Sequence, residues 1–262
     1  MSDLREEDML PMIAPSRTIG LDAPLRWLKL GWQDFKSIPK LSLGYGLVML
    51  IIALLIAWVA WKAQSLVVAI ALTGGFFFIG PALAIGLYSM SRQLDSGVKP
   101  MLMRCIREGR KNMGNELVLS LMFLIVFLLW ARAASMVHIF FPSFGNATFS
   151  DLAQFLGIGT IVGAIFAAVV FCVGAFSIPM LMDRTVDAVT AVLSSIAAVL
   201  KNKFTMAVWG LVIIGSVLLG IVTGFIGLVV ILPVIGHATW HAYQEVIDAS
   251  AWERNPGVGP SV

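Results

Sequence analysis

The sequence reads Ser177-Ile-Pro-Met-Leu-Met-Asp-Arg-Thr-Val-Asp-Ala-Val-Thr-Ala-Val192 at the point where a long apolar run meets charge. This pattern predicts a membrane-spanning helix that is followed by a helix on the membrane surface. Asp183 and Asp187 stand four residues apart, so one continuous helix would place both on the same face, with Arg184 beside them. A second apolar run ends in the same way over Gly236–Tyr243.

The composition argues against a soluble domain. The 262 residues are 59% hydrophobic and only 13% charged, whereas about a quarter of the residues of a soluble domain are charged. The apolar residues form several runs of about twenty, each long enough to cross ~30 Å of hydrocarbon as a helix. Lys and Arg flank these runs and do not form one large patch, which argues against nucleic-acid binding. We therefore expect an all-α membrane protein.

The apolar runs predict six transmembrane helices. Gly159 and Gly163 indicate close packing between helices, Pro81 predicts a kink, and a tight turn is expected at Thr223-Gly224, between the last two spans. The six spans are expected near Leu41–Trp61, Leu66–Met90, Asn115–Ala134, Phe155–Met182, Phe204–Val222 and Phe225–Tyr243.

Three amphipathic helices are expected on the membrane surface, one before each pair of spans. They begin near Pro24, Pro100 and Asp187, and each has an apolar stripe at helical spacing beside polar residues. The stripes consist of Leu25, Leu28, Trp32 and Phe35 in the first helix, Leu102, Cys105 and Ile106 in the second, and Val189, Val192, Leu193, Ile196 and Leu200 in the third.

Surface helix, outward span and returning span follow one another three times, in units at about residues 22–92, 99–182 and 186–248. All three units begin on the same side of the membrane. We therefore expect three parallel repeats about an axis along the membrane normal.

The two ends of the chain are expected to be tails in the cytoplasm. Residues 1–21 contain Pro11 and Pro15, which interrupt any helix, so they read as a disordered tail; residues 249–262 read as a short flexible tail. Sixteen of the eighteen Lys and Arg residues lie on the same side of the six spans as these ends. The positive-inside rule therefore predicts a multi-pass membrane protein with both termini in the cytoplasm.

Several dispersed blocks of sequence carry a resemblance to a known family. The blocks are Leu25–Phe35, Gly80-Pro81 with Gly86-Leu87-Tyr88, Trp130-Ala131-Arg132, Ser177–Thr190, Thr223–Gly227 and Gly236–Tyr243. In this order, over roughly residues 22–248, they resemble a bacterial integral-membrane family known as domain of unknown function 2189. The chain departs from it at Asn202-Lys203, where Asn-Pro is expected. Members are sometimes labelled as resembling subunit I of cytochrome c oxidase, but the family has no established activity, so the resemblance implies a membrane fold and no particular function.

A metal or haem site is one hypothesis for the polar end of the last span. His237, His241 and Glu245 follow at intervals of four and would line one stripe. Imidazole and carboxylate are metal ligands, and Asp183 and Asp187 leave the fourth span at a similar depth. We favour the alternative that these are ordinary interface residues, because the spacing fixes no third strong ligand. No metal and no other cofactor is therefore expected.

The same residues allow two further interpretations. Asp183, Arg184 and Asp187 are expected to form the terminus of a span, with Asp187 near a helix amino end, where negative charge is favoured. The alternative is a polar network that joins spans four and six, or a contact with a partner. Trp240 and Tyr243 are expected to be interface anchors.

Nothing in the spacing predicts catalysis. The sequence contains no Gly-rich phosphate loop, no nucleophile beside a base and no paired carboxylates in a cleft-like setting. Arg132, with Asp151 as a candidate partner, is expected to extend toward the outer surface, with a gating charge as the alternative.

We expect a non-catalytic scaffold or accessory protein that binds lipids or other membrane proteins, a respiratory complex included. A small-solute transporter or channel is the alternative. It would need a polar path, and spans one, five and most of four lack ionisable residues at mid-depth. A metal- or haem-binding membrane protein is the third class considered. The sequence specifies no oligomeric state.

Overall fold

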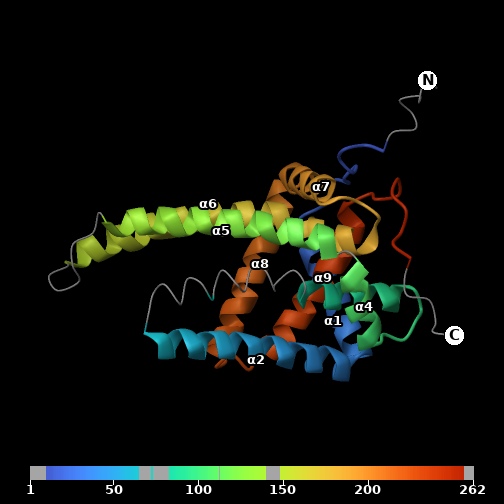
Figure 1. Cartoon of the computed structure of the whole chain (residues 1–262), viewed down its shortest axis with the longest axis horizontal. Helices are drawn as coiled ribbons and strands as arrows, with labels where there is room; N and C mark the ends of the chain where they lie inside the picture. Colours follow the sequence, from blue (N-terminus) through green and yellow to red (C-terminus); the bar gives the residue numbers. More distant parts are fainter. Residues whose placement is uncertain (1–9, 65–71, 73–82, 112, 140–147, 257–262) are drawn as a thin grey trace.

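The computed structural model describes residues 10–64, 72, 83–111, 113–139 and 148–256. In this part of the chain the regular structure is helical, and two isolated β-bridges join Ser16 to Ile247 and Arg184 to Arg254. Residues 83–95 are helical. The other helices (Figure 1) are α1 Ala23–Ser37, α2 Pro39–Ala63, α4 Leu102–Lys111, α5 Met113–Ile139, α6 Phe149–Asp183, α7 Ala188–Lys201, α8 Lys203–Val222 and α9 Leu228–Val246.

Four of the described helices are long and apolar enough to cross a membrane: α2, most of α5, α6 and most of α8. They match four of the six predicted spans. The span predicted over Leu66–Met90 lies largely outside the described residues, as does the kink predicted at Pro81. The span predicted over Phe225–Tyr243 corresponds to α9, which is not among the four because its second half is polar.

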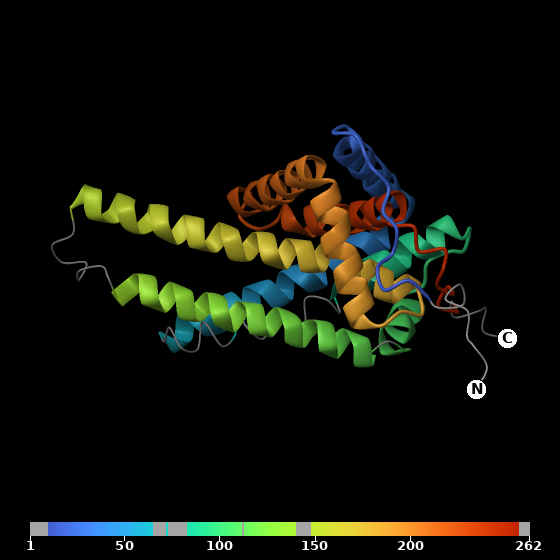
Figure 2. The ribbon, with the colours of Figure 1, turned by 90° about the horizontal axis from the view of Figure 1, so that it is seen from above.

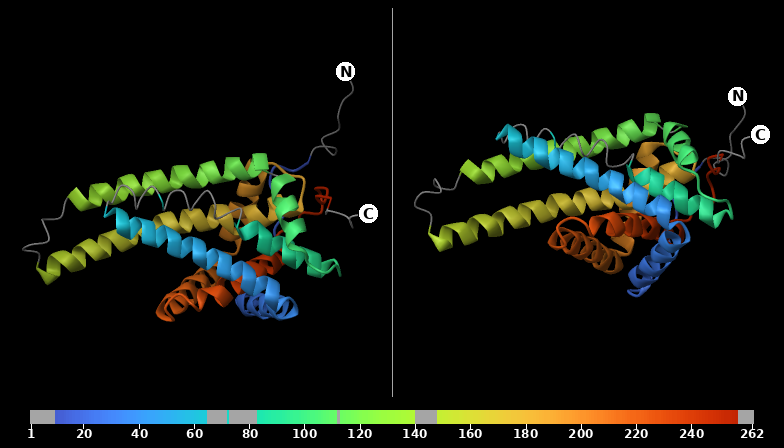
Figure 3. Two further views of the ribbon diagram at one scale, coloured as in Figure 1. Left: turned by 60° about the horizontal axis from the view of Figure 1, so that its bottom comes forward. Right: turned by 90° about the horizontal axis from the view of Figure 1, so that it is seen from below.

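The helices divide the molecule into a polar end and a set of projecting apolar helices. We define the polar end as α1, residues 83–95, α4, α7, the second half of α9 and the described chain ends at residues 10 and 256. From it α2, α5 and α6 extend in one general direction, and α5 and α6 run antiparallel side by side (Figures 2 and 3).

Helix α9 is the centre of the packing, with neighbours α1, α2, α6 and α8. Two glycines allow this close approach. A Cβ on Gly31 of α1 would lie 2.6 Å from the backbone N of Ala238, and a Cβ on Gly46 of α2 would lie 2.0 Å from the backbone O of Val229. Contacts this short exclude any side chain, so both positions let two helix backbones meet directly.

The first predicted surface helix is present as α1. However, the side of α1 that packs against protein is not the predicted apolar stripe. Trp27 is fully buried and meets Trp209 edge to face, with ring centroids 5.5 Å apart. Phe35, from the predicted stripe, is also buried, whereas Leu25 and Trp32 are exposed. The exposed pair is available to the membrane, and the Trp27 side of α1 packs against protein.

The third predicted surface helix is present as α7, and it packs on α6 through small residues. Asp187 caps its amino end, as expected, by accepting hydrogen bonds from the backbone N–H of Val189 and Thr190. Of the predicted stripe, Val192 is buried, but Val189 and Leu200 are exposed. The buried face consists instead mainly of Ala188, Thr190, Ala191, Ser194, Ser195, Ala198 and Val199.

One of these small residues enters the backbone of α6. The Ser195 hydroxyl accepts from the Phe176 N–H at 3.1 Å and donates to the Cys172 carbonyl at 2.7 Å. Cys172 and Phe176 are the acceptor and donor of one regular turn, so the hydroxyl of Ser195 bridges both of these backbone groups. At its other end, α6 begins with a capping box in which Thr148 and Asp151 bond each other, so Asp151 is engaged within its own helix and not with Arg132.

The described parts of the two predicted tails are held against the protein, and residues 1–9 and 257–262 lie outside the described residues. Residues 10–22 lie along α7, α8 and the end of α9: the Ala14 N–H donates to Ser194, and Asn202 bonds the backbone of Arg17 and Ile19. Residues 247–256 are likewise held, with Trp252 buried. Proline does prevent a helix at the amino end, but polar side chains of α7 and α8 satisfy the extended backbone.

Candidate functional site

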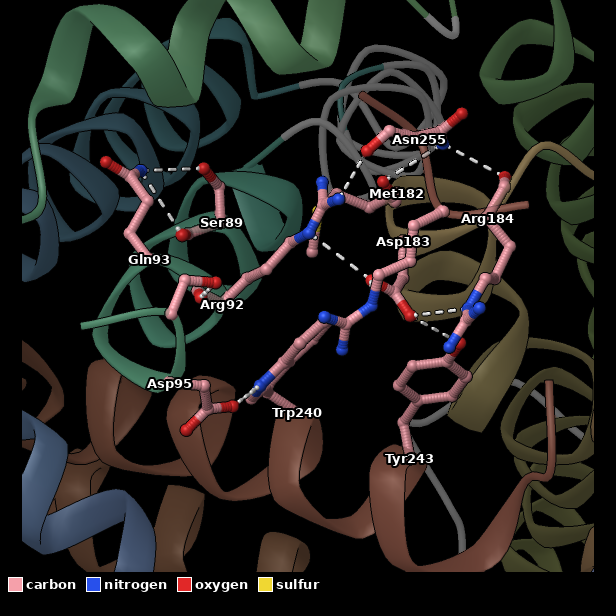
Figure 4. Close-up of polar contacts among 12 residues, drawn as sticks. Ser89, Arg92, Gln93, Asp95, Met182, Asp183, Arg184, Trp240, Tyr243 and Asn255 are labelled. Atoms are coloured by element: carbon pink, nitrogen blue, oxygen red, sulfur yellow. Dashed lines mark hydrogen bonds and ion pairs between the residues drawn. The ribbon is translucent and has the colours of Figure 1, made fainter. Parts of the chain in front are cut away.

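The carboxylate of Asp183, at the last residue of α6, is the centre of the first polar cluster (Figure 4). Its side chain is only 3% exposed. Oδ2 accepts hydrogen bonds from Arg184 Nε at 3.0 Å and from the Tyr243 hydroxyl at 3.1 Å. Oδ1 lies 3.3 Å from Arg92 Nε and 3.7 Å from Arg254 Nε, as ion pairs without hydrogen-bond geometry. We call these five residues the Asp183 cluster.

The Asp183 cluster joins four parts of the chain. Tyr243 comes from α9, Arg92 from residues 83–95 and Arg254 from the carboxyl-terminal segment, so Asp183 ties α6 to each of them. Asn255 completes the junction, because its Nδ2 donates to the backbone carbonyls of residues 181, 182 and 184 at 2.9–3.1 Å. These carbonyls include those of the last turn of α6, which carry partial negative charge and so favour nearby arginines.

A second cluster lies around Asp34 of α1. His241 Nε2 lies 2.9 Å from Asp34 Oδ2, and the Ser91 hydroxyl donates to the same oxygen at 2.7 Å. Ser91 Oγ also lies 2.8 Å from His237 Nδ1, and His237 Nε2 lies 3.1 Å from Ser42 Oγ. We call these five residues the Asp34 cluster.

The hydrogen bonds of the Asp34 cluster have a direction. Ser91 has one proton and donates it to Asp34, so it must accept from His237 Nδ1–H. In the neutral imidazole, Nε2 then accepts from the Ser42 hydroxyl. Ser42, Ser91 and His237 are completely buried, and both ring nitrogens of His237 are used within the protein. The pair of Ser42 and His237 has the geometry of a nucleophile and a base, but it is buried on every side.

Two more side chains of α9 have partners elsewhere in the polar end. Glu245 accepts from Arg26 Nη2 at 2.6 Å and from Trp27 Nε1 at 2.8 Å, both in α1. Trp240 is fully buried and donates from Nε1 to Asp95 at 2.6 Å. The polar half of α9 therefore makes side-chain contacts with α1, α2, α6 and residues 83–95.

The structure brings together only some of the residues singled out in the sequence. Asp183, Arg184 and Tyr243 meet, so the polar network considered as an alternative does join α6 and α9. His237 and His241 belong to the separate Asp34 cluster. Asp187 is at the amino end of α7, and Arg132 lies exposed near the far end of α5.

The spacing hypothesis for a metal is not supported by this arrangement. His237, His241 and Glu245 follow at intervals of four, but each bonds a different partner. In the described part of the chain, no three His, Cys, Asp or Glu residues come close enough to hold a metal ion.

The sequence interpretation missed the partners of these residues, which are Asp34, Ser42, Ser91, Arg92, Asp95, Arg254 and Asn255. One signal was present for two of them. Asp34 is the one acid within the first predicted surface helix, which otherwise carries basic charges, and Ser42 is a hydroxyl at the start of an apolar span. Polar residues in such surroundings need partners, although the sequence does not identify which ones.

Comparison with known families adds one finding. Residues 68–183 match the model of DUF2189. That family is described as "Predicted integral membrane protein". The DUF2189 match confirms the resemblance seen in the sequence, and together with the four apolar helices it identifies the chain as an integral membrane protein that contacts the lipid bilayer.

The part that matches DUF2189 includes α4, α5 and α6, and it contains Arg92 and Asp183 of the Asp183 cluster. It ends at Asp183 itself. The partners Tyr243 and Arg254 come from the part of the chain that follows the match. No curated protein and no solved structure matches the chain.

Proposed function

We propose that this protein is a non-catalytic membrane scaffold, and that α5 and α6 bind a transmembrane helix of another membrane protein. One observation carries the proposal: an apolar cavity of about 500 Å³ lies between these helices. Phe127 and Trp130 of α5 and Gly163, Ala167 and Phe171 of α6 contribute to its lining. An opening of this kind on two spans suits an apolar partner.

Small residues on α6 support a helix as the occupant. Gly159, Gly163 and Ala167 stand four residues apart, so they form one stripe along the helix. Among the described residues, no heavy atom lies within 4 Å of a Cβ built on Gly159 or Gly163. Helices approach most closely over such stripes, because no side chain separates the backbones. The stripe and the cavity share Gly163 and Ala167.

The alternatives receive less support. A transporter or channel needs polar groups along its path, whereas the residues that line this cavity are apolar. Catalysis at Ser42 and His237 would require access to side chains that are completely buried. The polar residues of both clusters are used to hold the helices of the polar end together, which fits a scaffold.

We also propose the finer architecture: six spans in three parallel units, in the bacterial inner membrane, with both termini in the cytoplasm. The order of the described helices supports the units, since α4, α5 and α6 are followed by α7, α8 and α9. The hydrogen bonds of Arg17 with Val246 and of Asp248 with Pro15 hold the two described ends of the chain together, which supports termini on one side. The excess of Lys and Arg on that side supports the cytoplasmic side.

The test is affinity purification of the tagged full chain from its native membrane in mild detergent. We expect the wild type to retain a stoichiometric membrane protein. Gly163→Leu should lose it, because the leucine side chain would separate α6 from the helix of the partner. Gly157→Leu is the matched control, because Gly157 is also in open space on α6 but lies on a different face.

A partner that stays bound to Gly163→Leu would contradict this docking site. A wild-type protein that emerges without any partner would contradict the scaffold role. Folding of each variant is checked by its elution volume and thermal unfolding.

A further inference from the structure

We propose that the guanidinium groups of the Asp183 cluster bind a phosphate group at the membrane surface, carried by an anionic lipid headgroup or by a soluble anion. The site is separate from the cavity between α5 and α6, and the inference does not depend on the scaffold role. It rests on the exposure of Arg254, on the fixed positions of its neighbours and on the place of the cluster at the end of a span.

Arg254 is the accessible member of the cluster. Its side chain is 57% exposed, and its contact with Asp183 is an ion pair through Nε at 3.7 Å. Within the described residues, no hydrogen-bond acceptor is assigned to its Nη1 or Nη2. Both can therefore donate to a phosphate, for which the planar guanidinium is well suited.

The other arginines are held in place by the protein itself. Arg184 donates from Nη1 to the Trp252 carbonyl at 2.9 Å and from Nε to Asp183. Arg92 donates from Nη2 to the Asn255 carbonyl. Two of these bonds come from the segment that carries Arg254, so the guanidiniums of Arg92 and Arg184 are ordered before any ligand arrives. Such preorganisation lowers the entropic cost of binding.

The charge of the cluster favours an anion. The carboxylate of Asp183 lies 3.0 Å from Arg184 and 3.3 Å from Arg92, but 3.7 Å from Arg254. Among these three arginines, the exposed guanidinium of Arg254 is therefore the one that Asp183 neutralises least. A phosphate would supply the remaining charge.

The position of the cluster, directly after the apolar run of α6, suits a lipid phosphate as ligand. Asp183 is the last residue of α6, a helix long enough to cross the membrane. Headgroups form the layers directly outside ~30 Å of hydrocarbon. Basic pockets at the ends of spans are the usual binding sites for anionic headgroups.

The experiment measures the thermal unfolding temperature of the full chain in nanodiscs. One sample contains phosphatidylcholine alone, a second contains added phosphatidylglycerol, and a third contains phosphatidylcholine with inorganic phosphate in the buffer. The variant is Arg254→Gln. The control is Lys36→Gln, which removes the same charge from an exposed position in α1.

Three results would support the site. Phosphatidylglycerol should raise the unfolding temperature of the wild type, Arg254→Gln should lose most of that rise, and Lys36→Gln should keep it. A rise with inorganic phosphate alone, lost in Arg254→Gln, supports the same site with a soluble anion as ligand.

Two results would overturn it: no rise with either phosphate source, or an equal loss in both variants. If Arg254→Gln unfolds in phosphatidylcholine, Arg254→Lys replaces it. This variant keeps the charge but loses the planar fork, and it should retain only part of the rise.

Discussion

The two ends of α6 have opposite surroundings. At the carboxyl end, Asp183 is almost completely buried among arginines, Tyr243 and the segment that carries Asn255. At the amino end, the helix caps itself through Thr148 and Asp151, and side chains such as Ile161 are 63% exposed. One helix thus combines a half that is built into the protein with a half that is open to the membrane. The difference indicates that polar contacts order the carboxyl-terminal half of α6, while the amino-terminal half is left for lipid or a partner.

The largest expected effect comes from removing the charge of Asp183. Asp183→Asn keeps the shape but leaves the surrounding guanidiniums without their buried carboxylate, which typically costs about 3–5 kcal/mol. We expect a large fall in the unfolding temperature in mild detergent. Asp22→Asn removes a carboxylate that is 70% exposed and paired with Arg26, so it should change stability little. Equal stability of the two variants would refute the importance of the Asp183 cluster.

A smaller loss is expected where α2 meets α9. Gly46→Ala would place a Cβ 2.0 Å from the Val229 carbonyl oxygen, and overpacking of this kind costs about 1–3 kcal/mol. Gly44→Ala, two residues earlier in open space, should be neutral or stabilising because alanine favours the helix. The measurement is thermal unfolding of both variants in the same detergent. If Gly46→Ala were as stable as Gly44→Ala, α2 and α9 would be further apart than this contact indicates.

The amino-terminal cap of α7 should contribute about 1 kcal/mol, the usual value of an N-cap. Burial raises the pKa of Asp187, but the hydrogen bonds from Thr190 and Val189 outweigh it and hold the pKa below its ordinary value. A lowered pKa in the folded state means that the stabilisation is present above the unfolded pKa and is lost as the pH falls through the folded pKa.

Unfolding of Asp187→Ala at neutral and at acid pH tests this assignment. The deficit relative to the wild type should shrink in acid. A deficit that is independent of pH would show that the carboxylate is not the origin of the effect.

The smallest effect is expected in the open half of α6. Ile161→Ala shortens a side chain that is 63% exposed, so it should change the free energy of unfolding by no more than about 0.5 kcal/mol. The measurement is again thermal unfolding in mild detergent. A loss comparable to that of Gly46→Ala would mean that this half is packed against protein, and the contrast between the two ends of α6 would disappear.

The sequence predicted the helices well because their boundaries depend on local chemistry. Asp187 is a good N-cap and α7 begins immediately after it; the turn at Thr223-Gly224 appears with Gly224 at φ 66°. Four predicted spans coincide with long apolar helices. Such features depend on residues that are near one another in the chain.

Helix faces and distant partners were harder to predict. In a membrane both the lipid-facing and the protein-facing sides of a helix are apolar, so the stripe through Val189 and Leu200 did not identify the buried side of α7. Small residues such as Ser195 and Ala198 did. The pairs that join different elements in the candidate site are 57–219 positions apart, from Ser91 with Asp34 to Arg26 with Glu245. One sequence provides no signal that relates residues at such distances.

The bonds between residues 10–22 and the end of α9 have a consequence for biosynthesis. Arg17 N–H donates to the Val246 carbonyl, and Asp248 N–H donates to the Pro15 carbonyl, both at 2.8 Å. A ribosome makes the first partner of each pair more than two hundred residues before the second. Residues 10–22 must therefore wait, without their final partners, until α9 has been synthesised, so assembly of the polar end is one of the last steps in the production of this protein.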